Sequence, residues 1–242
     1  MKHTPPEIDG LIVTLNKMGY MNTEPEFYNE AFIEFSAQSP APCLEIGTAY
    51  GRTAIAALKK GAKIIANDLS KDHLDILWQN TPEDLRANLT LIPGAFPEAL
   101  SIEDNTIGAV LSSRVLNFVE PDTLPYAIEK IYNCLKPGGK FFFLAGSPFM
   151  HNFFRFLPEY WENKAKNAPW PGLLKNIPAY VPERAEDLPY FINLLDIETV
   201  SLLVNNRGFI IEKIGYSGAT SLHPDDMRLD GREHVGVIAV KP

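Results

Sequence analysis

The residues best suited to ligand chemistry follow two short apolar runs in the first third of the chain. Glu45 lies in the run 43–46, and Gly47-Thr48-Ala49-Tyr50-Gly51 comes directly after it. Glycines let the backbone turn sharply and approach a ligand closely. The next apolar run, 64–66, leads to Asp68, whose carboxylate is able to accept two hydroxyl hydrogen bonds from a ribose diol. The residue types and their spacing therefore indicate a ligand that contains ribose.

The loop sequence excludes two common nucleotide-binding patterns. Only the outer glycines of a nicotinamide fingerprint, Gly47 and Gly51, are present, and the pattern G-x-x-x-x-G-K-[ST] is absent. The carboxylate of Glu45 would repel a pyrophosphate but would help to hold a ligand with an amino group and a sulfonium. S-adenosylmethionine carries both of these groups and a ribose. The competing interpretation is that the glycines only shape a turn and that Asp68 only caps the next helix, for which Ser70 is better placed.

The apolar pattern around these residues alternates between strands and helices. Strands are predicted at 43–46, 64–66, 89–92, 107–111 and 140–144, with a final antiparallel strand pair at 209–214 and 235–240. Alternation of this kind is typical of an α/β fold. It predicts a doubly wound, Rossmann-like, mostly parallel sheet of seven strands with helices on both faces. Ligands of such sheets bind beyond the carboxyl ends of the strands, which is where the glycine loop falls.

Several residues mark the ends of the predicted helices. Ser70 is a predicted N-cap, and Asp196 is a predicted N-cap of a later helix that ends at Gly208. An earlier amphipathic helix is predicted over 24–37, with Phe27 on its apolar face.

Aromatic residues and prolines concentrate in one part of the chain. Ten of the 26 Phe, Trp and Tyr residues and seven of the 20 prolines fall within 148–195. This segment is too long for an ordinary connection between a strand and a helix, so we interpret it as a lid insertion. The chain then divides into an N-terminal helical cap (1–42), a cofactor-binding core (43–147), the lid (148–195) and a C-terminal helix with the last strand pair (196–242).

Four motifs follow one another along the chain. They are Glu45-x-Gly47-x-x-x-Gly51, the acid Asp68, Pro93-Gly94-Ala95-Phe96 after the third strand, and Leu135-Lys136-Pro137-Gly138-Gly139 before the fifth. In this order they make the chain resemble the class I S-adenosylmethionine-dependent methyltransferases, over residues 43–147 and 196–241. The resemblance implies S-adenosylmethionine as the cofactor and methyl transfer as the activity.

The resemblance also implies a role for individual residues. The loop after the first strand would hold the methionine end of the cofactor, Asp68 the ribose hydroxyls, and the later positions the adenine and the amino-acid part. The implied cofactor-binding residues are Glu45, Gly47, Thr48, Ala49, Gly51, Asp68, Leu69, Ala95, Phe96 and Ser112. Two of them depart from the family pattern. Ala49 replaces a frequent glycine, which requires a negative φ, and Ala95 replaces a frequent acid, which leaves a backbone contact to adenine.

Methyl transfer from a sulfonium is an in-line displacement, for which a protein mainly supplies alignment and a dry site. A lid rich in aromatic residues suits an apolar or aromatic acceptor, and oxygen is the favoured acceptor atom. An oxygen acceptor needs a base, and His151, just past the fifth strand, is the candidate. The alternative is that His151 is a surface residue, as we also expect of His73.

The charge balance bears on the partners of the chain. Its 242 residues include 22 Lys+Arg and 30 Asp+Glu, a net charge of −8, whereas proteins that bind a phosphate backbone usually show a basic surface. No NPPY-type tetrapeptide follows the fourth strand, and no acidic pair there suits a metal ion. We therefore expect a small-molecule substrate, no nucleic acid and no metal. A protein methyltransferase and a non-catalytic binding domain remain as alternatives.

Other features of the sequence concern the compartment. The first ten residues have no apolar core of signal-peptide length, and no later run is long enough to span a membrane. Cys43 and Cys134 lack metal-ligand spacing and are interpreted as buried small hydrophobic residues. These features indicate a cytoplasmic protein and leave open whether it forms a homo-oligomer.

Overall fold

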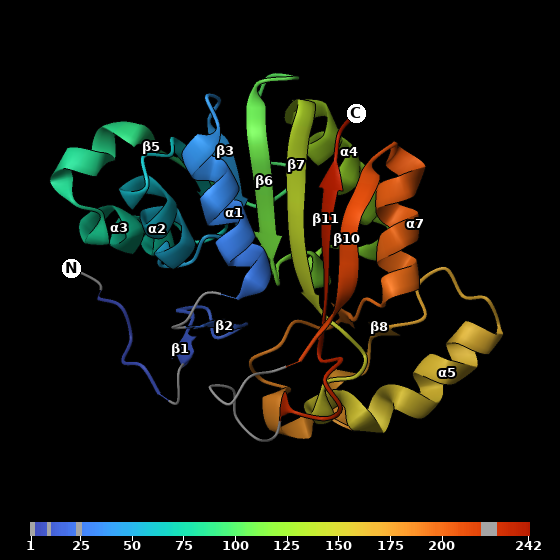
Figure 1. Cartoon of the computed structure of the whole chain (residues 1–242). Helices are drawn as coiled ribbons and strands as arrows, with labels where there is room; N and C mark the ends of the chain where they lie inside the picture. The colour runs from blue at the N-terminus through green and yellow to red at the C-terminus, as the bar shows by residue number, and fades with distance from the viewer. Residues whose placement is uncertain (1–2, 9–10, 23–25, 219–226) are drawn as a thin grey trace.

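A seven-stranded sheet runs through the middle of the molecule, in the strand order β10-β11-β7-β6-β3-β4-β5 (Figure 1). The structure is a computed structural model and describes residues 3–8, 11–22, 26–218 and 227–242. The strands of the sheet are β3 (Cys43–Ile46), β4 (Ile64–Asp68), β5 (Leu89–Pro93), β6 (Ile107–Ser113), β7 (Leu135–Gly146), β10 (Ile210–Ser217) and β11 (His234–Val240). The pairings from β5 to β7 are parallel, and β11 runs antiparallel between β7 and β10. This arrangement confirms the predicted fold class, including the antiparallel last strand pair.

Helices cover both faces of the sheet, because its central strands are apolar on both sides. On one face lie α1 (Phe27–Gln38), α2 (Arg52–Lys59) and α3 (Lys71–Asn80), and on the other lie α4 (Leu124–Cys134) and α7 (Ile197–Arg207). Successive residues of β7 alternate between the two cores, as the pleat of a strand requires. Phe142 is buried in the first core, whereas Phe141 and Phe143 are buried in the second.

Two parts of the chain lie at the carboxyl edge of the parallel strands, at the bottom of Figure 1. The first is a hairpin of β1 (Leu11–Val13) and β2 (Tyr20–Asn22). The second lies between β7 and α7 and has a buried hydrophobic cluster of its own, centred on Phe149, Phe156 and Tyr160. Its elements are the 3₁₀ helix His151–Phe156, α5 (Leu157–Ala165), β8 (Leu173–Leu174), α6 (Ile177–Tyr180), the 3₁₀ helix Pro182–Arg184 and β9 (Ile192–Asn193). Three more 3₁₀ helices, Glu83–Asn88, Leu116–Phe118 and Pro121–Thr123, lie in the connections of the core.

Asp196 joins this second segment to the core. Its Oδ1 accepts a hydrogen bond from the backbone N–H of Thr199 (2.7 Å), which caps α7 as predicted. Its Oδ2 accepts from the Tyr160 hydroxyl (2.7 Å) and from the Lys164 ammonium (2.9 Å), both on α5. Burial opposes ionisation of Asp196, but these hydrogen bonds prevail and lower the pKa of its carboxyl. One buried carboxylate therefore both starts α7 and fixes α5 beside it.

The structure differs from the expected elements in two places. The predicted helix start at Glu24 lies outside the described residues, and Phe27, expected on the apolar face, is 50% exposed at the first position of α1. The run 136–139 ends α4 as predicted, but it belongs to β7, which starts at Leu135. The expected domain boundaries after 42, 147 and 195 remain predictions.

Gly51 illustrates how closely α2 approaches α3. It occupies the N-cap of α2 with φ +79°, in the left-handed region that favours glycine. A Cβ at this position would lie 2.0 Å from Cδ1 of Leu77, which is fully buried. Gly61 has a similar φ of +91°, but a Cβ there would meet no atom of the described residues within 4 Å. The two glycines therefore separate backbone strain from a side-chain clash.

We predict that Gly51→Ala lowers the free energy of unfolding by roughly 3 kcal/mol, the sum of left-handed strain and overpacking. The matched control Gly61→Ala carries the strain alone and loses about 1 to 2 kcal/mol. Urea-induced unfolding of the two variants measures both values. Equal losses would show that Leu77 moves away at no cost, contrary to the packing described above.

Candidate functional site

A cavity of about 490 Å³ lies at the carboxyl ends of β3, β4 and β6. Its walls come from parts of the chain that are far apart in sequence. They include the β1–β2 hairpin, α1 and α2, the loops after β3, β4 and β5, the residues that follow β6, the segment between β7 and α7, and the start of β11. Among the residues in its wall are Glu45, Gly47, Thr48, Ala49, Asp68, Leu69, Ala95 and Phe96. The structure thus brings most of the predicted cofactor-binding residues together around one space.

The loop after β3 is held in place by the end of β4. The backbone N–H groups of Gly47 and Thr48 both donate to the carbonyl oxygen of Asn67, at 2.8 and 3.0 Å. The side-chain amide of Asn67 in turn donates to the carbonyl oxygens of Ile92 and Gly94, at the end of β5 and just after it. Gly47 has φ +70°, and a Cβ there would lie 2.2 Å from Cγ2 of Val115. The conformation and the packing of this loop both require glycine at position 47.

Ala49 does not have the negative φ that its substitution for glycine was expected to require. Its φ is +47°, in the left-handed region. This conformation directs the Ala49 N–H at Oδ2 of Asp68, at 2.8 Å. A hydrogen bond to a charged acceptor is stronger than one between neutral groups, and it offsets part of the strain of about 1 to 2 kcal/mol.

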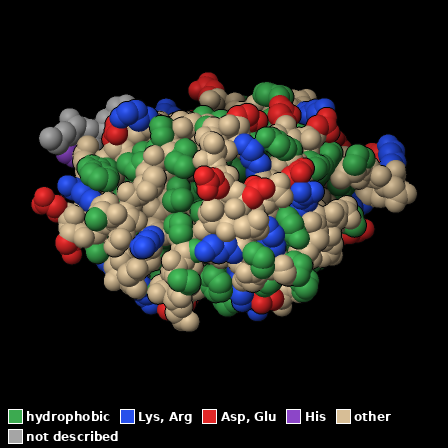
Figure 2. All heavy atoms as spheres, turned by 90° about the horizontal axis from the view of Figure 1, so that it is seen from above, with side chains coloured by type: hydrophobic (Ala, Val, Ile, Leu, Met, Phe, Trp, Pro, Cys, Tyr) green, Lys and Arg blue, Asp and Glu red, His purple; other side chains and the backbone are tan. Residues whose placement is uncertain are grey.

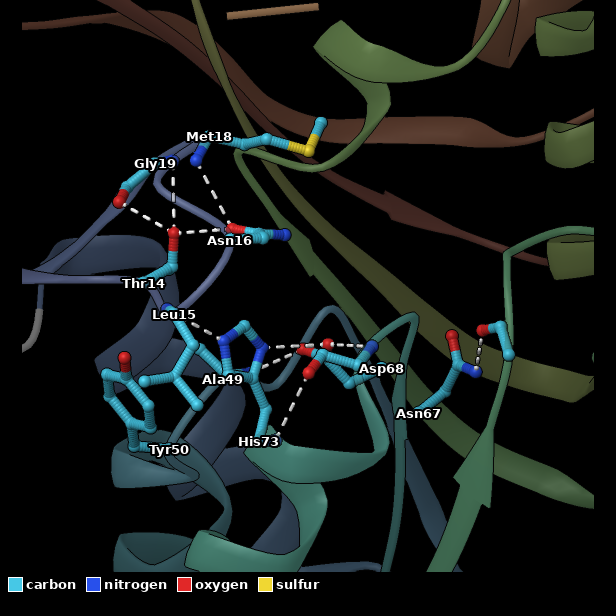
Figure 3. Close-up of polar contacts among 12 residues, drawn as sticks. Thr14, Leu15, Asn16, Met18, Gly19, Ala49, Tyr50, Asn67, Asp68 and His73 are labelled. Atoms are coloured by element: carbon cyan, nitrogen blue, oxygen red, sulfur yellow. Dashed lines mark hydrogen bonds and ion pairs between the residues drawn. The ribbon is translucent and has the colours of Figure 1, made fainter. Parts of the chain in front are cut away.

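Asp68 accepts hydrogen bonds from three nitrogen atoms of the protein. Besides Ala49 at Oδ2, the Ser70 N–H donates to Oδ1 at 2.8 Å, and Nδ1 of His73 lies 2.9 Å from the same oxygen (Figure 3). A carboxylate offers about four lone-pair positions. Among the described residues, one position on Oδ2 is therefore left for a ligand, whereas the sequence suggested room for two hydroxyl groups.

Glu45 is the second carboxyl group in the wall of the cavity, and it is 5% exposed. Burial raises the pKa of its carboxyl to about 7, and the negative charge of Asp68 contributes a smaller part of the increase. The Thr48 hydroxyl donates to its Oε2 at 2.9 Å, which favours the charged form. Near neutral pH this carboxyl group is poised to lose its proton when a cation comes close.

The remaining predicted residues take different positions. Leu69 is 61% exposed at the edge of the cavity, and Phe96 is buried in its wall. Gly51 and Ser112 are not in the described wall, and the hydroxyl of Ser112 is buried without a hydrogen-bond partner among the described residues. His151 is exposed, stacks on Phe154 with ring centroids 5.4 Å apart, and is likewise outside the described wall. Its catalytic role remains a prediction from the sequence.

Sequence reasoning missed two contributors to the site. The β1–β2 hairpin forms one wall of the cavity. His73, expected at the surface, is 2% exposed and also lines the cavity. Its position after the Ser70 N-cap was a usable signal, since a residue in the first turn of a helix that follows a binding strand lies near the ligand. Within the described part of the chain, no group of three His, Cys, Asp or Glu residues suits a metal ion.

Comparison with known proteins bears on this site. The sequence profile of a family described as "Methyltransferase domain" matches residues 44–143. A tRNA N(3)-methylcytidine methyltransferase, trm140 of Schizosaccharomyces pombe, is 34% identical over 106 residues. That match covers 41% of this chain and 34% of the relative, so the chain spans about a third of the relative's length.

Solved structures share the fold. An S-adenosylmethionine-dependent methyltransferase from Mesorhizobium loti superposes with a TM-score of 0.65 at 17% identity, over 88% of this chain and 95% of that one. A geranyl diphosphate methyltransferase, solved in complex with GPP and sinefungin, superposes with a TM-score of 0.62 at 13% identity, over 88% of this chain and 78% of the other. Residues 44–143 therefore match a methyltransferase domain family, and the fold is shared with S-adenosylmethionine-dependent methyltransferases. The family match and the shared fold imply S-adenosylmethionine as the cofactor.

We expected a small-molecule partner and no nucleic acid, and this expectation is wrong. A relative that shares 34% of its residues over 106 positions is a tRNA methyltransferase. Net charge describes the long-range attraction of a whole surface, so a value of −8 does not determine what enters one cavity. Of the remaining expectations, the lack of a membrane span agrees with the structure: each helix in the described ranges is too short or too polar to cross a bilayer.

The residues in the cavity wall fit this cofactor. Asp68 retains one acceptor position for a ribose hydroxyl, and Glu45 is a buried carboxyl group without a cationic partner among its described contacts. An ammonium or sulfonium group would supply that positive charge. Leu69, Ala95 and Phe96 offer apolar surface to an adenine ring.

We predict that cofactor affinity increases between about pH 5 and 7, by up to tenfold per pH unit. Because the pKa of Glu45 is raised to about 7, its carboxyl group is mostly protonated below pH 7 in the protein without ligand. A bound cation favours the ionised carboxylate, so binding releases a proton and weakens as the pH falls. Calorimetric titrations across this range measure the slope. Glu45→Gln has no proton to release, and a slope unchanged in that variant would contradict the assignment.

Proposed function

We propose that this chain transfers the methyl group of S-adenosylmethionine to an apolar or aromatic acceptor group held in the cavity beside the lid. When bound, the cofactor supplies the methyl group on a sulfonium centre. The observation that supports the proposal is the single cavity, which joins the two carboxyl groups of the cofactor side to an apolar wall from the segment between β7 and α7. The residues of the protein then have to bind, align and exclude water.

The acceptor side of the cavity is mostly apolar. The segment between β7 and α7 contributes five apolar residues, Met150, Phe153, Leu188, Ile192 and Leu194, and one polar residue, Asn152, to the wall. Such a surface favours a flat or apolar group over a highly charged one. The preference for an oxygen acceptor depended on His151 as a base, and because that residue is exposed, we do not carry the preference into the proposal.

Asn117 gives this side of the cavity a fixed shape. Its side-chain nitrogen donates to the carbonyl oxygens of Gly146 (3.0 Å) and Asn193 (2.7 Å), and its Oδ1 accepts from the Gly146 N–H (3.0 Å). Asn117 thereby ties the residues after β6 to the end of β7 and to β9. Together with the Asp196 contacts to α5, it supports a lid that stays in register with the cofactor side.

A second candidate is methylation of a base in RNA. It is favoured by the 34% identity with a tRNA methyltransferase. A nucleobase is flat and aromatic, so a base turned out of its stack also meets the requirements of an apolar wall. Lysine, arginine and acidic side chains are interspersed on the face opposite the hairpin and the lid (Figure 2). That face therefore has no continuous positive patch for an RNA backbone.

Transfer of a labelled methyl group tests the proposal and separates the candidates. The chain is incubated with methyl-labelled S-adenosylmethionine and, in parallel, with total RNA, a protein fraction and a small-molecule extract from cells. We expect label in one fraction and none with heat-inactivated protein. If calorimetry detects no binding of S-adenosylmethionine and no fraction takes up label, the proposed function is overturned.

A variant on the acceptor side tests the place of the acceptor. Leu188 is partly buried in the cavity wall and has no contact with the carboxyl groups of the cofactor side in the described structure. We predict that Leu188→Trp fills acceptor space and lowers methyl transfer roughly tenfold or more, because misalignment of the reacting groups is costly. Cofactor affinity should stay within about twofold of wild type, since no new charge faces it. Equal loss of cofactor binding and transfer would place the acceptor elsewhere.

A further inference from the structure

His73 makes two side-chain hydrogen bonds in opposite directions. On one side, its Nδ1 lies 2.9 Å from Oδ1 of Asp68. On the other side, its Nε2 accepts from the backbone N–H of Leu15 at 3.1 Å. Figure 3 shows the ring between these two partners. A carboxylate oxygen only accepts and a backbone nitrogen only donates, so the ring is neutral, with its proton on Nδ1.

Leu15 belongs to the turn of the β1–β2 hairpin. Within this turn the Thr14 hydroxyl donates to Oδ1 of Asn16 (2.7 Å) and accepts from the Gly19 N–H (3.1 Å), and Oδ1 of Asn16 also accepts from the Met18 N–H (3.2 Å). Thr14, Asn16, Met18 and Gly19 all line the cavity. The turn is therefore an ordered wall of the site, and it is tied to the cofactor side through Leu15.

Tyr50 provides a second tie to the hairpin. Its hydroxyl donates to the carbonyl oxygen of Val13 at 2.7 Å, and its ring packs edge-on against His73 with centroids 5.2 Å apart. Both aromatic residues are almost fully buried. Of the two, only His73 also contacts Asp68 by a hydrogen bond in the described structure.

We propose that His73 is a positioning residue that orients the ribose-binding carboxylate of Asp68 and at the same time holds the hairpin over the cavity. Its Nδ1–H holds the Asp68 carboxylate in the orientation that leaves a single acceptor position on Oδ2. Its Nε2 holds Leu15, and with it the hairpin (residues 11–22), over the same cavity. The inference has two halves: the orientation of Asp68 toward a ribose (the ribose half) and the attachment of the hairpin through Leu15 (the hairpin half). The ribose half rests on the proposed function.

Two conservative variants separate the two halves. In His73→Asn the amide nitrogen reproduces the Nδ1–H toward Asp68, but no atom reaches Leu15. In His73→Gln the amide oxygen reproduces the Nε2 acceptor toward Leu15, but no donor faces Asp68. His73→Phe keeps a ring against Tyr50 and loses both hydrogen bonds. Asp75→Asn is a control on the same helix, because Asp75 is exposed and pairs with Lys71.

Two measurements are made on each variant. A purely structural role of His73 would not change one of them while leaving the other unchanged. Hydrogen exchange of the Leu15 amide reports the hairpin tie. The ratio of affinities for S-adenosylhomocysteine and for its 2′-deoxy and 3′-deoxy analogues reports the bond between Asp68 and the ribose. In wild type we expect a protected amide and a preference of about tenfold or more for one hydroxyl group.

We expect His73→Asn to lose amide protection and to keep the hydroxyl preference, and His73→Gln to show the reverse. His73→Phe should lose both, and Asp75→Asn neither. The inference is overturned if His73→Phe, folded as judged by thermal unfolding, keeps both properties. If wild type does not bind S-adenosylhomocysteine at all, the proposed function and the ribose half both fail, while the Leu15 exchange still decides the hairpin half.

Discussion

The hydrogen bonds received by Asp68 hold the site together. This carboxylate, at the end of β4, accepts from the loop after β3 through Ala49 and from the start of α3 through Ser70 and His73. Three neighbouring parts of the chain thus depend on one side chain. Because the contacts include a charged acceptor, losing the carboxylate would leave N–H groups unsatisfied in a buried place, which is more costly than losing the bonds alone. The same residue is therefore fixed by the fold and is the one proposed to receive the ribose.

Asp196 plays a similar structural part on the side of the cavity proposed for the acceptor. It starts α7 and accepts from Tyr160 and Lys164 of α5, so the segment between β7 and α7 is anchored where the chain re-enters the core. With Asn117, which joins β6, β7 and β9, it leaves this aromatic segment little freedom relative to the sheet. The apolar cluster inside the segment adds its own burial. The walls of the cavity are thus preorganised on both sides, which favours alignment of two reactants.

Much of the fold was predictable because it depends on local signals. The N-caps at Ser70 and Asp196 accept from His73 N–H and Thr199 N–H, and Gly208 has a φ of +100° at the end of α7. The positions and directions of the strands followed from the alternation of apolar runs. The burial of His73 was not predictable in this way, because it depends on Leu15, 58 positions earlier in the chain. The positive φ of Ala49 depends on Asp68, and no local pattern pairs these two residues.

The parts proposed to hold the acceptor lie outside the part that matches the family. The family match ends at residue 143, whereas the apolar wall begins at Met150 and the hairpin lies before residue 23. Proteins named for a tRNA and for geranyl diphosphate both resemble this chain, one in sequence over 106 residues and the other in fold. A shared fold does not by itself determine a substrate. In the function proposed above, the choice of acceptor depends on the hairpin and on the segment between β7 and α7, and the hydrogen bonds from Asp68 through His73 to Leu15 connect the hairpin to the cofactor side.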